Sequence, residues 1–197
     1  MTEDEFIAAI LRNPLNGEIL RRLPALGLPD CWLVAGCLYQ AVWNLKSGRP
    51  PDADVKDYDV FYFDSADLSY EAEDRAIRAA ERLFADLAAQ GAVVEVRNQA
   101  RVHLWYERKF GVPYAPLSSA TDGISRFLVA GTCVGVQPDA DGGIARLFAP
   151  YGLEEMEQGL LRPCPLLRNP ARYAEKVASY KARWPWLREA AACTRPE

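Results

Sequence analysis

The sequence contains a single histidine, no Cys-x-x-Cys pair, no block of lysine and arginine, and no apolar run of membrane-spanning length. Because the five cysteines are scattered, their spacing excludes zinc-ribbon and thioredoxin-like sites, and we expect free thiols. Residues 1–5 are acidic and show no secretion signal. Together these absences predict a cytoplasmic protein without a membrane partner.

Positive charge is also scarce, since 23 lysines and arginines face 27 aspartates and glutamates, giving a formal net charge of −4. This balance argues against a protein whose main task is to bind duplex nucleic acid electrostatically. A nucleotide substrate is still compatible with it, because such a ligand needs only a local metal ion and one or two cations. At 197 residues and 50% hydrophobic content, we expect one ordered domain over residues 1–197, with a core at about 30–120 and a C-terminal extension at about 121–197.

Residues 57–64 form the most informative stretch of the chain. They are rich in aromatic and β-branched residues, which favours a buried strand. The strand period of two places Asp57 and Asp59 on the same face. Two carboxylates this close raise each other's pKa unless a cation lies between them. Because Mg²⁺ prefers one or two carboxylates together with water and phosphate oxygens, the stretch predicts a divalent metal site.

The remaining pattern mixes helices and strands without strict alternation, which predicts an α+β or mixed-sheet α/β class. Short apolar runs predict strands at residues 31–35, 92–96, 132–136 and 144–148, the last two forming a hairpin. Helical spacing predicts a first helix capped at Thr2 or Asp4, a second that ends near Leu26, and further helices at 38–45, 66–90, 101–110, 118–127, 152–161 and 170–192, the last kinked or split at Pro185.

Two features accompany the paired aspartates. Gly36 ends the strand at residues 31–35 and is followed directly by a predicted helix, and Glu95 lies within the strand at residues 92–96. A glycine turn that opens a helix, an Asp-x-Asp strand and a later strand carboxylate resemble the nucleotidyltransferase superfamily with the DNA polymerase β-like fold. The chain is also similar to a bacterial nucleotidyltransferase-like family once classed as a domain of unknown function, from about Trp32 to Leu187, at residues 35–36, 42–43, 57–64, 94–105, 132–136, 149–154 and 184–187.

The resemblance implies a polymerase β-like α+β fold, with a mixed central sheet flanked by helices and with added C-terminal strands and a helix. It also implies an enzyme that transfers a nucleoside monophosphate from a nucleoside triphosphate to a hydroxyl acceptor. Asp57 and Asp59 would then bind the Mg²⁺ (or Mn²⁺) that bridges the triphosphate. Glu95 would complete a second metal site and help to deprotonate the attacking hydroxyl.

The same resemblance implies a nucleotide-binding turn. Gly36 would let the backbone approach the phosphates, and the N–H groups that open the next helix would bind them. Cys37 stands where the superfamily usually has serine, and a thiol is a weak donor. Arg97, Asn98 and Arg101 follow Glu95, where they would either contact phosphate or base, or cap and solubilise the next helix.

Other interpretations compete with this one. A catalytically degenerate member that binds a nucleotide or a protein partner would explain Cys37, and a D-x-D glycosyltransferase would explain the aspartates alone. His103 is expected to be a hydrogen-bonded structural residue, and Trp43, Trp105, Trp184 and Trp186 are expected in the core rather than in a base-stacking platform. The absence of a basic platform favours a small-molecule or protein hydroxyl over nucleic acid as the acceptor.

Overall fold

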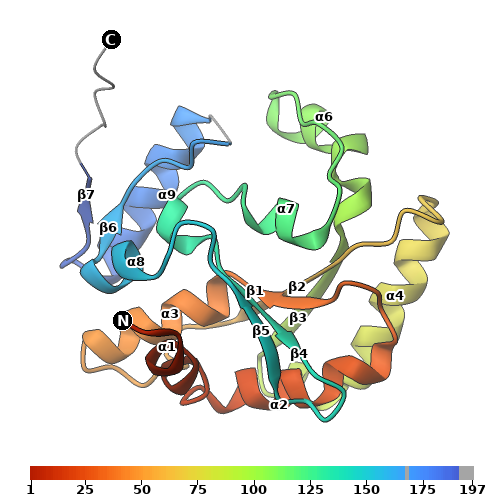
Figure 1. The fold of residues 1–197 in the computed structure, drawn as a ribbon, viewed down its shortest axis with the longest axis horizontal. Helices are drawn as coiled ribbons and strands as arrows, with labels where there is room; N and C mark the ends of the chain where they lie inside the picture. Colours follow the sequence, from red (N-terminus) through yellow and green to blue (C-terminus); the bar gives the residue numbers. More distant parts are fainter. Residues whose placement is uncertain (167–168, 191–197) are drawn as a thin grey trace.

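The computed structural model describes residues 1–166 and 169–190. Its centre is a five-stranded mixed sheet in the order β3-β2-β1-β4-β5 (Figure 1). Only β2 and β3 are parallel, and the other neighbours are antiparallel. The expected mixed sheet flanked by helices is therefore confirmed, and its strands are β1 (Trp32–Val34), β2 (Asp57–Tyr62), β3 (Val93–Asn98), β4 (Gly135–Pro138) and β5 (Ile144–Phe148).

Helices surround this sheet, and a small parallel pair, β6 (Leu160–Leu161) with β7 (Arg188–Glu189), joins the C-terminal segments. The α-helices are α1 (Glu3–Ile10), α2 (Pro14–Arg22), α3 (Gly36–Lys46), α4 (Tyr70–Leu83), α5 (Ala85–Ala88), α6 (Tyr106–Phe110), α7 (Ala120–Ile124), α8 (Glu154–Gln158) and α9 (Pro170–Arg183). Short 3-10 helices are η1 (Leu23–Leu26), η2 (Gln99–Leu104) and η3 (Ala130–Thr132). Within the described part of the chain, no helix combines the length and apolarity that crossing a membrane requires.

The helix predicted at residues 66–90 begins late and is divided. Local side-chain bonds hold the preceding segment in turns, because the Asp64 carboxylate accepts from the Ala66 N–H and the Asp67 carboxylate accepts from the Ser69 N–H. The Ser69 hydroxyl then caps α4 by accepting from the Ala72 N–H. The helix ends at Phe84, and the short α5 follows.

The prediction at residues 170–192 was wrong beyond Arg183, where α9 ends. Trp184 has φ −131° and ψ 86°, outside the helical region, because the residue before a proline is pushed toward extended conformations. The chain then turns and adds β7, and residues 191–192 of the predicted helix lie outside the described part. Other segments also differ from the prediction. Residues 101–110 form η2 and α6, residues 118–127 contain the shorter α7, residues 152–161 form α8 and β6, and the strand at 132–136 begins at Gly135.

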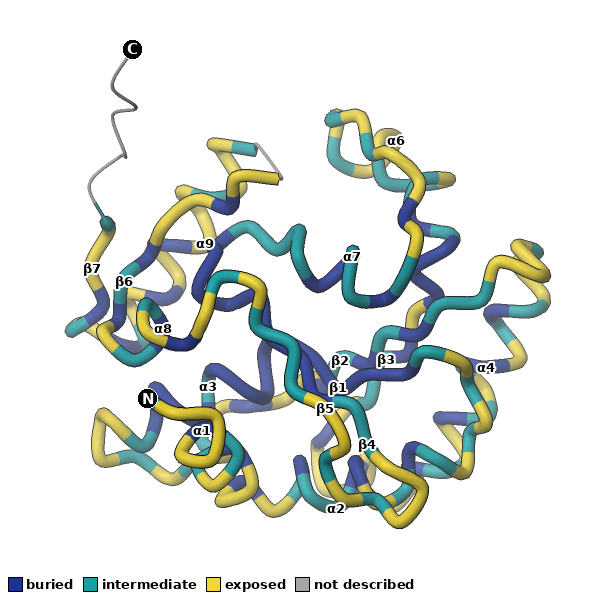
Figure 2. Tube along the Cα trace, in the orientation of Figure 1, coloured by how far each residue is buried: buried dark blue, intermediate teal, exposed yellow. Residues whose placement is uncertain are grey.

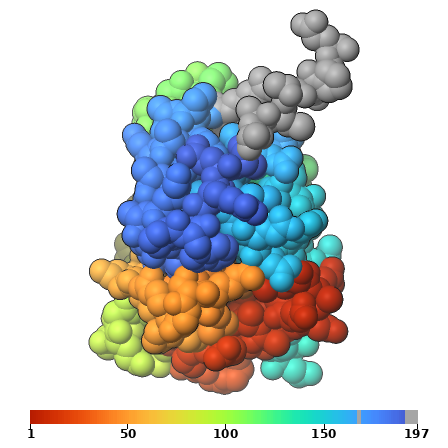
Figure 3. All heavy atoms as spheres, turned by 90° about the vertical axis from the view of Figure 1, so that its left-hand side faces the viewer, coloured from red at the N-terminus to blue at the C-terminus, as the bar shows by residue number. Residues whose placement is uncertain are grey.

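The C-terminal segments lie against α3 (Figures 2 and 3). Large buried rings form the contact. Trp43 and Trp184 are buried, with ring centroids 5.2 Å apart, which confirms both as core residues. The Trp184 indole N–H donates to the Asn44 side chain at 3.0 Å, and the Trp43 indole N–H donates to the Met156 carbonyl at 3.0 Å. Trp186 is half-buried at the edge of this cluster.

Candidate functional site

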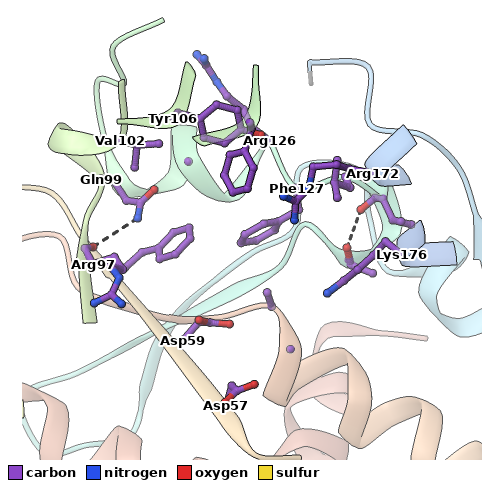
Figure 4. A pocket seen from close by; sticks show the side chains of 18 of the residues that line it. Asp57, Asp59, Arg97, Gln99, Val102, Tyr106, Arg126, Phe127, Arg172 and Lys176 are labelled. Atoms are coloured by element: carbon purple, nitrogen blue, oxygen red, sulfur yellow. Dashed lines mark hydrogen bonds between the residues drawn. The ribbon is translucent and has the colours of Figure 1, made fainter. Parts of the chain in front are cut away.

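The two strand aspartates face a pocket of about 370 Å³ (Figure 4). On β2, the buried residues Tyr58, Val60 and Tyr62 alternate with the more exposed Asp57 and Asp59. The Tyr58 hydroxyl accepts from the Asn13 side chain, which caps α2, so the buried face packs against the N-terminal helices. The opposite face therefore carries both carboxylates into the pocket, as the strand period predicted.

The glycine turn lies beside these carboxylates. Ala35 caps α3 with φ 51° and ψ −109°, and Gly36 is the first residue of the helix. A Cβ built on Gly36 would lie 3.9 Å from the Asp59 carboxylate and 3.1 Å from the Gln40 amide nitrogen. Glycine thus leaves space next to Asp59, at a helix end whose first N–H groups have no intrahelical acceptor.

Glu95 lies beside Asp59 on the neighbouring strand, as the resemblance implied, but its carboxylate pairs with an arginine. It is the register partner of Asp59 across the parallel β2–β3 pair. Burial, then the charges of Glu95 and Asp57, raise the pKa of Asp59 to about 6. The Glu95 carboxylate nevertheless pairs with Arg97 on its own strand at 3.2 Å and does not line the pocket.

The predicted cluster of three carboxylates is therefore not formed. Among residues 1–166 and 169–190, no three His, Cys, Asp or Glu side chains lie close enough to share a metal ion. Asp57 and Asp59 alone still fit Mg²⁺, which accepts one or two carboxylates and completes its shell with water and phosphate. Burial, followed by the charges of Glu95 and Asp57, raises the pKa of Asp59, and a bound cation would favour its charged form.

Cys37 does not face the pocket. Its side chain is completely buried, and the thiol donates to the Val34 carbonyl at 3.7 Å. Burial, reinforced by the charge of Asp59, raises the pKa of this thiol well above its usual value. The thiol therefore lies on the core side of the turn and does not line the pocket, where the resemblance implied a nucleotide contact.

Arg97, Asn98 and Arg101 divide between the two roles that the sequence left open. Arg97 lines the pocket. Asn98 caps η2, since its side-chain oxygen accepts from the Ala100 N–H at 3.1 Å and its amide nitrogen donates to the Asp64 carbonyl at 2.8 Å. Arg101 forms an ion pair with the buried Glu73 and donates to the Leu68 carbonyl at 3.0 Å. Asn98 and Arg101 thus hold structure outside the pocket.

The C-terminal half contributes cations to the pocket that the sequence did not predict. Arg172 and Lys176 on α9 and Arg126 after α7 line the pocket, and the Lys176 side chain extends toward Asp59 (Figure 4). Burial lowers the pKa of Lys176, while the charge of Asp59 opposes this change. The helical spacing of Arg172, Lys176 and Arg183 was the signal available, because it places three cations along one helix.

Gln40 also lines the pocket, and a hydrogen bond from Arg183 fixes the orientation of its side-chain amide. Its side-chain oxygen accepts from Arg183 at 2.7 Å. A guanidinium group has only donors, so the amide oxygen must face Arg183. The amide nitrogen is then the atom nearest the position of a Gly36 Cβ, at 3.1 Å, where it adds a donor beside the turn.

Trp105 and His103 differ from expectation. Trp105 is half-buried and lines the pocket rather than the core. His103 lies outside the pocket, and its buried Nδ1 has no hydrogen-bond partner among the described residues.

Comparison with known proteins agrees with this geometry. The sequence profile of the nucleotidyltransferase family matches residues 21–188. A solved domain described as "a CCA-adding enzyme head domain" is 26% identical, covers 97% of each chain and superposes with a TM-score of 0.73. A chain from "tRNA-processing enzyme complex 3" is 14% identical over 89% of this chain and 43% of that one, and its TM-score of 0.47 is too low to carry an argument.

No curated protein matches the sequence significantly. The family profile spans most of the chain, including both aspartates, the glycine turn and α9. The chain therefore belongs to the nucleotidyltransferase family and has its fold.

Proposed function

We propose that the protein transfers a nucleoside monophosphate from a nucleoside triphosphate to a hydroxyl acceptor, with Mg²⁺ (or Mn²⁺) held by Asp57 and Asp59. One observation carries the proposal: the paired carboxylates and the Gly36 turn lie together in a pocket that four basic side chains also line. The basic residues are Arg97, Arg126, Arg172 and Lys176. Although the chain is acidic overall, its pocket carries an excess of positive charge, which suits a triphosphate bound with a metal ion.

In the proposed reaction, the acceptor hydroxyl oxygen attacks the α-phosphorus. A new oxygen–phosphorus bond forms, the bond to the oxygen bridging the α- and β-phosphorus breaks, pyrophosphate leaves, and the hydroxyl proton is released to a base. A bound Mg²⁺ supplies Lewis-acid stabilisation of the phosphate charge. Lys176 and Arg97 neutralise phosphate oxygens, and the N–H groups that open α3 bind them. A role for Glu95 as the base requires its ion pair with Arg97 to open.

The class of acceptor is inferred from the structural likeness and from the net charge of the chain. The likeness to a CCA-adding enzyme head domain supports nucleotide addition as the reaction type. The net charge of −4 and the lack of a basic block favour a small-molecule or protein hydroxyl over nucleic acid. We place the reaction in the cytoplasm. Membership of the family leaves the D-x-D glycosyltransferase interpretation without support.

A titration of ATP, GTP, CTP and UTP with Mg²⁺ or Mn²⁺ tests the site, and pyrophosphate release tests the chemistry. We expect metal-dependent binding of at least one nucleotide, reduced by about 100-fold or more in Asp57→Asn/Asp59→Asn because both charged metal ligands are lost. Asp141→Asn, in the exposed β4–β5 loop, is the control and should bind as the wild type does. Binding that is independent of metal and unchanged in the double variant contradicts the proposal.

The second candidate is a non-catalytic nucleotide-binding protein. The ion pair between Glu95 and Arg97 favours it, because this pair keeps the third carboxylate out of the pocket. Metal-dependent binding without pyrophosphate release, across a panel of hydroxyl acceptors, would support this candidate over the enzyme.

A further inference from the structure

The pocket contains an unusual concentration of half-buried aromatic rings. In the core, by contrast, Trp32, Tyr58 and Trp184 are at 0% exposure. Six rings that line the pocket are instead only partly covered: Phe61, Trp105, Tyr106, Phe110, Tyr114 and Phe127. We call these six residues the aromatic wall. Apolar surface left open inside a pocket marks a ligand site, because burying it elsewhere would have stabilised the fold.

The rings of the aromatic wall contact one another. The centroids of Tyr106 and Tyr114 are 4.2 Å apart with planes tilted by 35°, and Phe110 lies 4.7 Å from Tyr106. Phe61, from β2, lies 5.6 Å from Phe127. Figure 4 shows Phe127 between the aspartates at one end of the pocket and Tyr106 at the other. The pocket thus has a carboxylate end and an aromatic end.

Packing of the fold does not account for this arrangement. Helix α6 has no buried residue, yet Tyr106 and Phe110 project from it into the pocket. Tyr106 and Tyr114 are half-buried, so their rings are partly shielded from water without belonging to the core. This partial burial raises the pKa of both hydroxyls.

Cations complete the aromatic end. The Arg126 guanidinium lies 5.4 Å from the Tyr114 ring centroid, and the Arg172 guanidinium lies 4.1 Å from that of Phe110. The second contact joins α9 to α6. Aromatic faces combined with guanidinium groups are the composition that binds unpaired nucleobases by stacking and attracts their phosphates.

We propose that the aromatic wall stacks a nucleobase while the carboxylate end of the pocket holds phosphates. This inference rests on the proposed function and adds the class of ligand that occupies the second end. The base belongs either to the donor triphosphate or to an acceptor that itself carries a nucleobase. Both sources use the same stacking chemistry, and the binding experiment separates them.

The experiment compares the wild type with Tyr106→Leu and Tyr114→Leu, which remove a ring but retain an apolar side chain. Tyr70→Leu is the matched control, because Tyr70 lies outside the pocket, is 67% exposed, and also has an arginine, Arg101, 6.0 Å from its ring. Each protein is titrated with inorganic tripolyphosphate and Mg²⁺, with the four nucleoside triphosphates and Mg²⁺, and with the four nucleosides in saturating Mg²⁺ and tripolyphosphate. Circular dichroism confirms that the variants fold.

If the donor supplies the base, a triphosphate binds about tenfold or more tightly than tripolyphosphate, and each ring variant loses about tenfold of that affinity. If the acceptor supplies it, triphosphate and tripolyphosphate bind alike. A nucleoside then binds the loaded protein, about tenfold more weakly in each ring variant. In both cases the ring variants bind tripolyphosphate as tightly as the wild type does, and Tyr70→Leu binds every ligand as the wild type does.

Two results would overturn the inference. Ring variants that bind triphosphates and nucleosides as tightly as the wild type would remove the role of the aromatic wall. The inference would also fail if the wild type bound tripolyphosphate and the triphosphates with equal affinity and bound no nucleoside. The proposed function would remain intact in that case. Failure of the wild type to bind any of these ligands would overturn both proposals together.

Discussion

Ala35 shows how one residue shapes the pocket. Its φ of 51° and ψ of −109° lie outside the regions that residues with a side chain normally adopt. The next residue, Gly36, lines the pocket beside Asp59. Backbone strain is therefore stored at the turn that the proposed phosphates would contact.

Replacing Ala35 with glycine should relieve that strain. We expect Ala35→Gly to stabilise the fold by about 1 kcal/mol and to raise the Tm by about 2–4 °C in a thermal scan. Ala41→Gly, in the regular part of α3, is the control and should lower the Tm, since glycine costs about 1 kcal/mol inside a helix. A lower Tm for Ala35→Gly would show that the turn is unstrained.

Residues near the aspartates were predictable to different degrees. Strand period alone placed Asp57 and Asp59 on one face, because each side chain alternates with a buried neighbour. The ion pair between Glu95 and Arg97 was not predictable, since it depends on how the two side chains are oriented along β3. Asn98 followed the local capping rule that its short amide favours.

A partly buried ion pair between Arg101 and Glu73 connects η2 with α4. Glu73 also accepts from the Asn98 N–H at 2.9 Å. Arg101→Met should cost about 3 kcal/mol in the free energy of unfolding, because it leaves a buried carboxylate without its cation. Denaturant unfolding measures the cost, and Arg75→Met, at an exposed pair, should lose less than about 1 kcal/mol.

The same Arg101 variant also tests a role that the sequence suggested. Arg101 does not line the pocket, so the affinity of folded Arg101→Met for a nucleoside triphosphate should equal that of the wild type. A large loss of affinity in this variant would restore Arg101 as a nucleotide ligand.

Helix α9 supplies much of the positive charge of the pocket. Lys176→Met should weaken binding of tripolyphosphate with Mg²⁺ by about tenfold, because it removes one charged donor from the pocket. Lys181→Met changes the same residue type on the same helix, but Lys181 pairs with Glu189 at 3.5 Å outside the pocket. Calorimetry should find its affinity unchanged, and equal losses in both variants would refute a specific role for Lys176.

Among the elements, β1 to β3, α3 and the β4–β5 hairpin were predictable from the sequence, because each has a clear period or a defined turn. The predicted last helix was too long, because α9 ends at Arg183, two residues before Pro185. The cations of α9 were missed because they come from a segment more than a hundred residues after the aspartates, and only folding brings the two together.

For the whole molecule, contacts between α3 and α9 predict a single cooperative unit. Trp184→Ala should cost about 4 kcal/mol, since it leaves a large cavity and removes the indole N–H that donates to the Asn44 side-chain oxygen. Unfolding followed by circular dichroism and by fluorescence should coincide in the wild type. Trp186→Ala, at a half-buried ring, should cost clearly less. Separate transitions would show that the C-terminal extension folds independently.

The contact between α3 and α9 also has a consequence for synthesis on the ribosome. The aspartates of β2 are translated early, whereas Arg172, Lys176 and the Arg183 that orients Gln40 follow more than a hundred residues later. A nascent chain that ends before α9 presents two neighbouring carboxylates without these basic residues of α9. Such a chain keeps Arg97 and Arg126 but lacks the other two basic side chains of the pocket. If the proposed function holds, we expect it to bind a triphosphate more weakly than the complete pocket does.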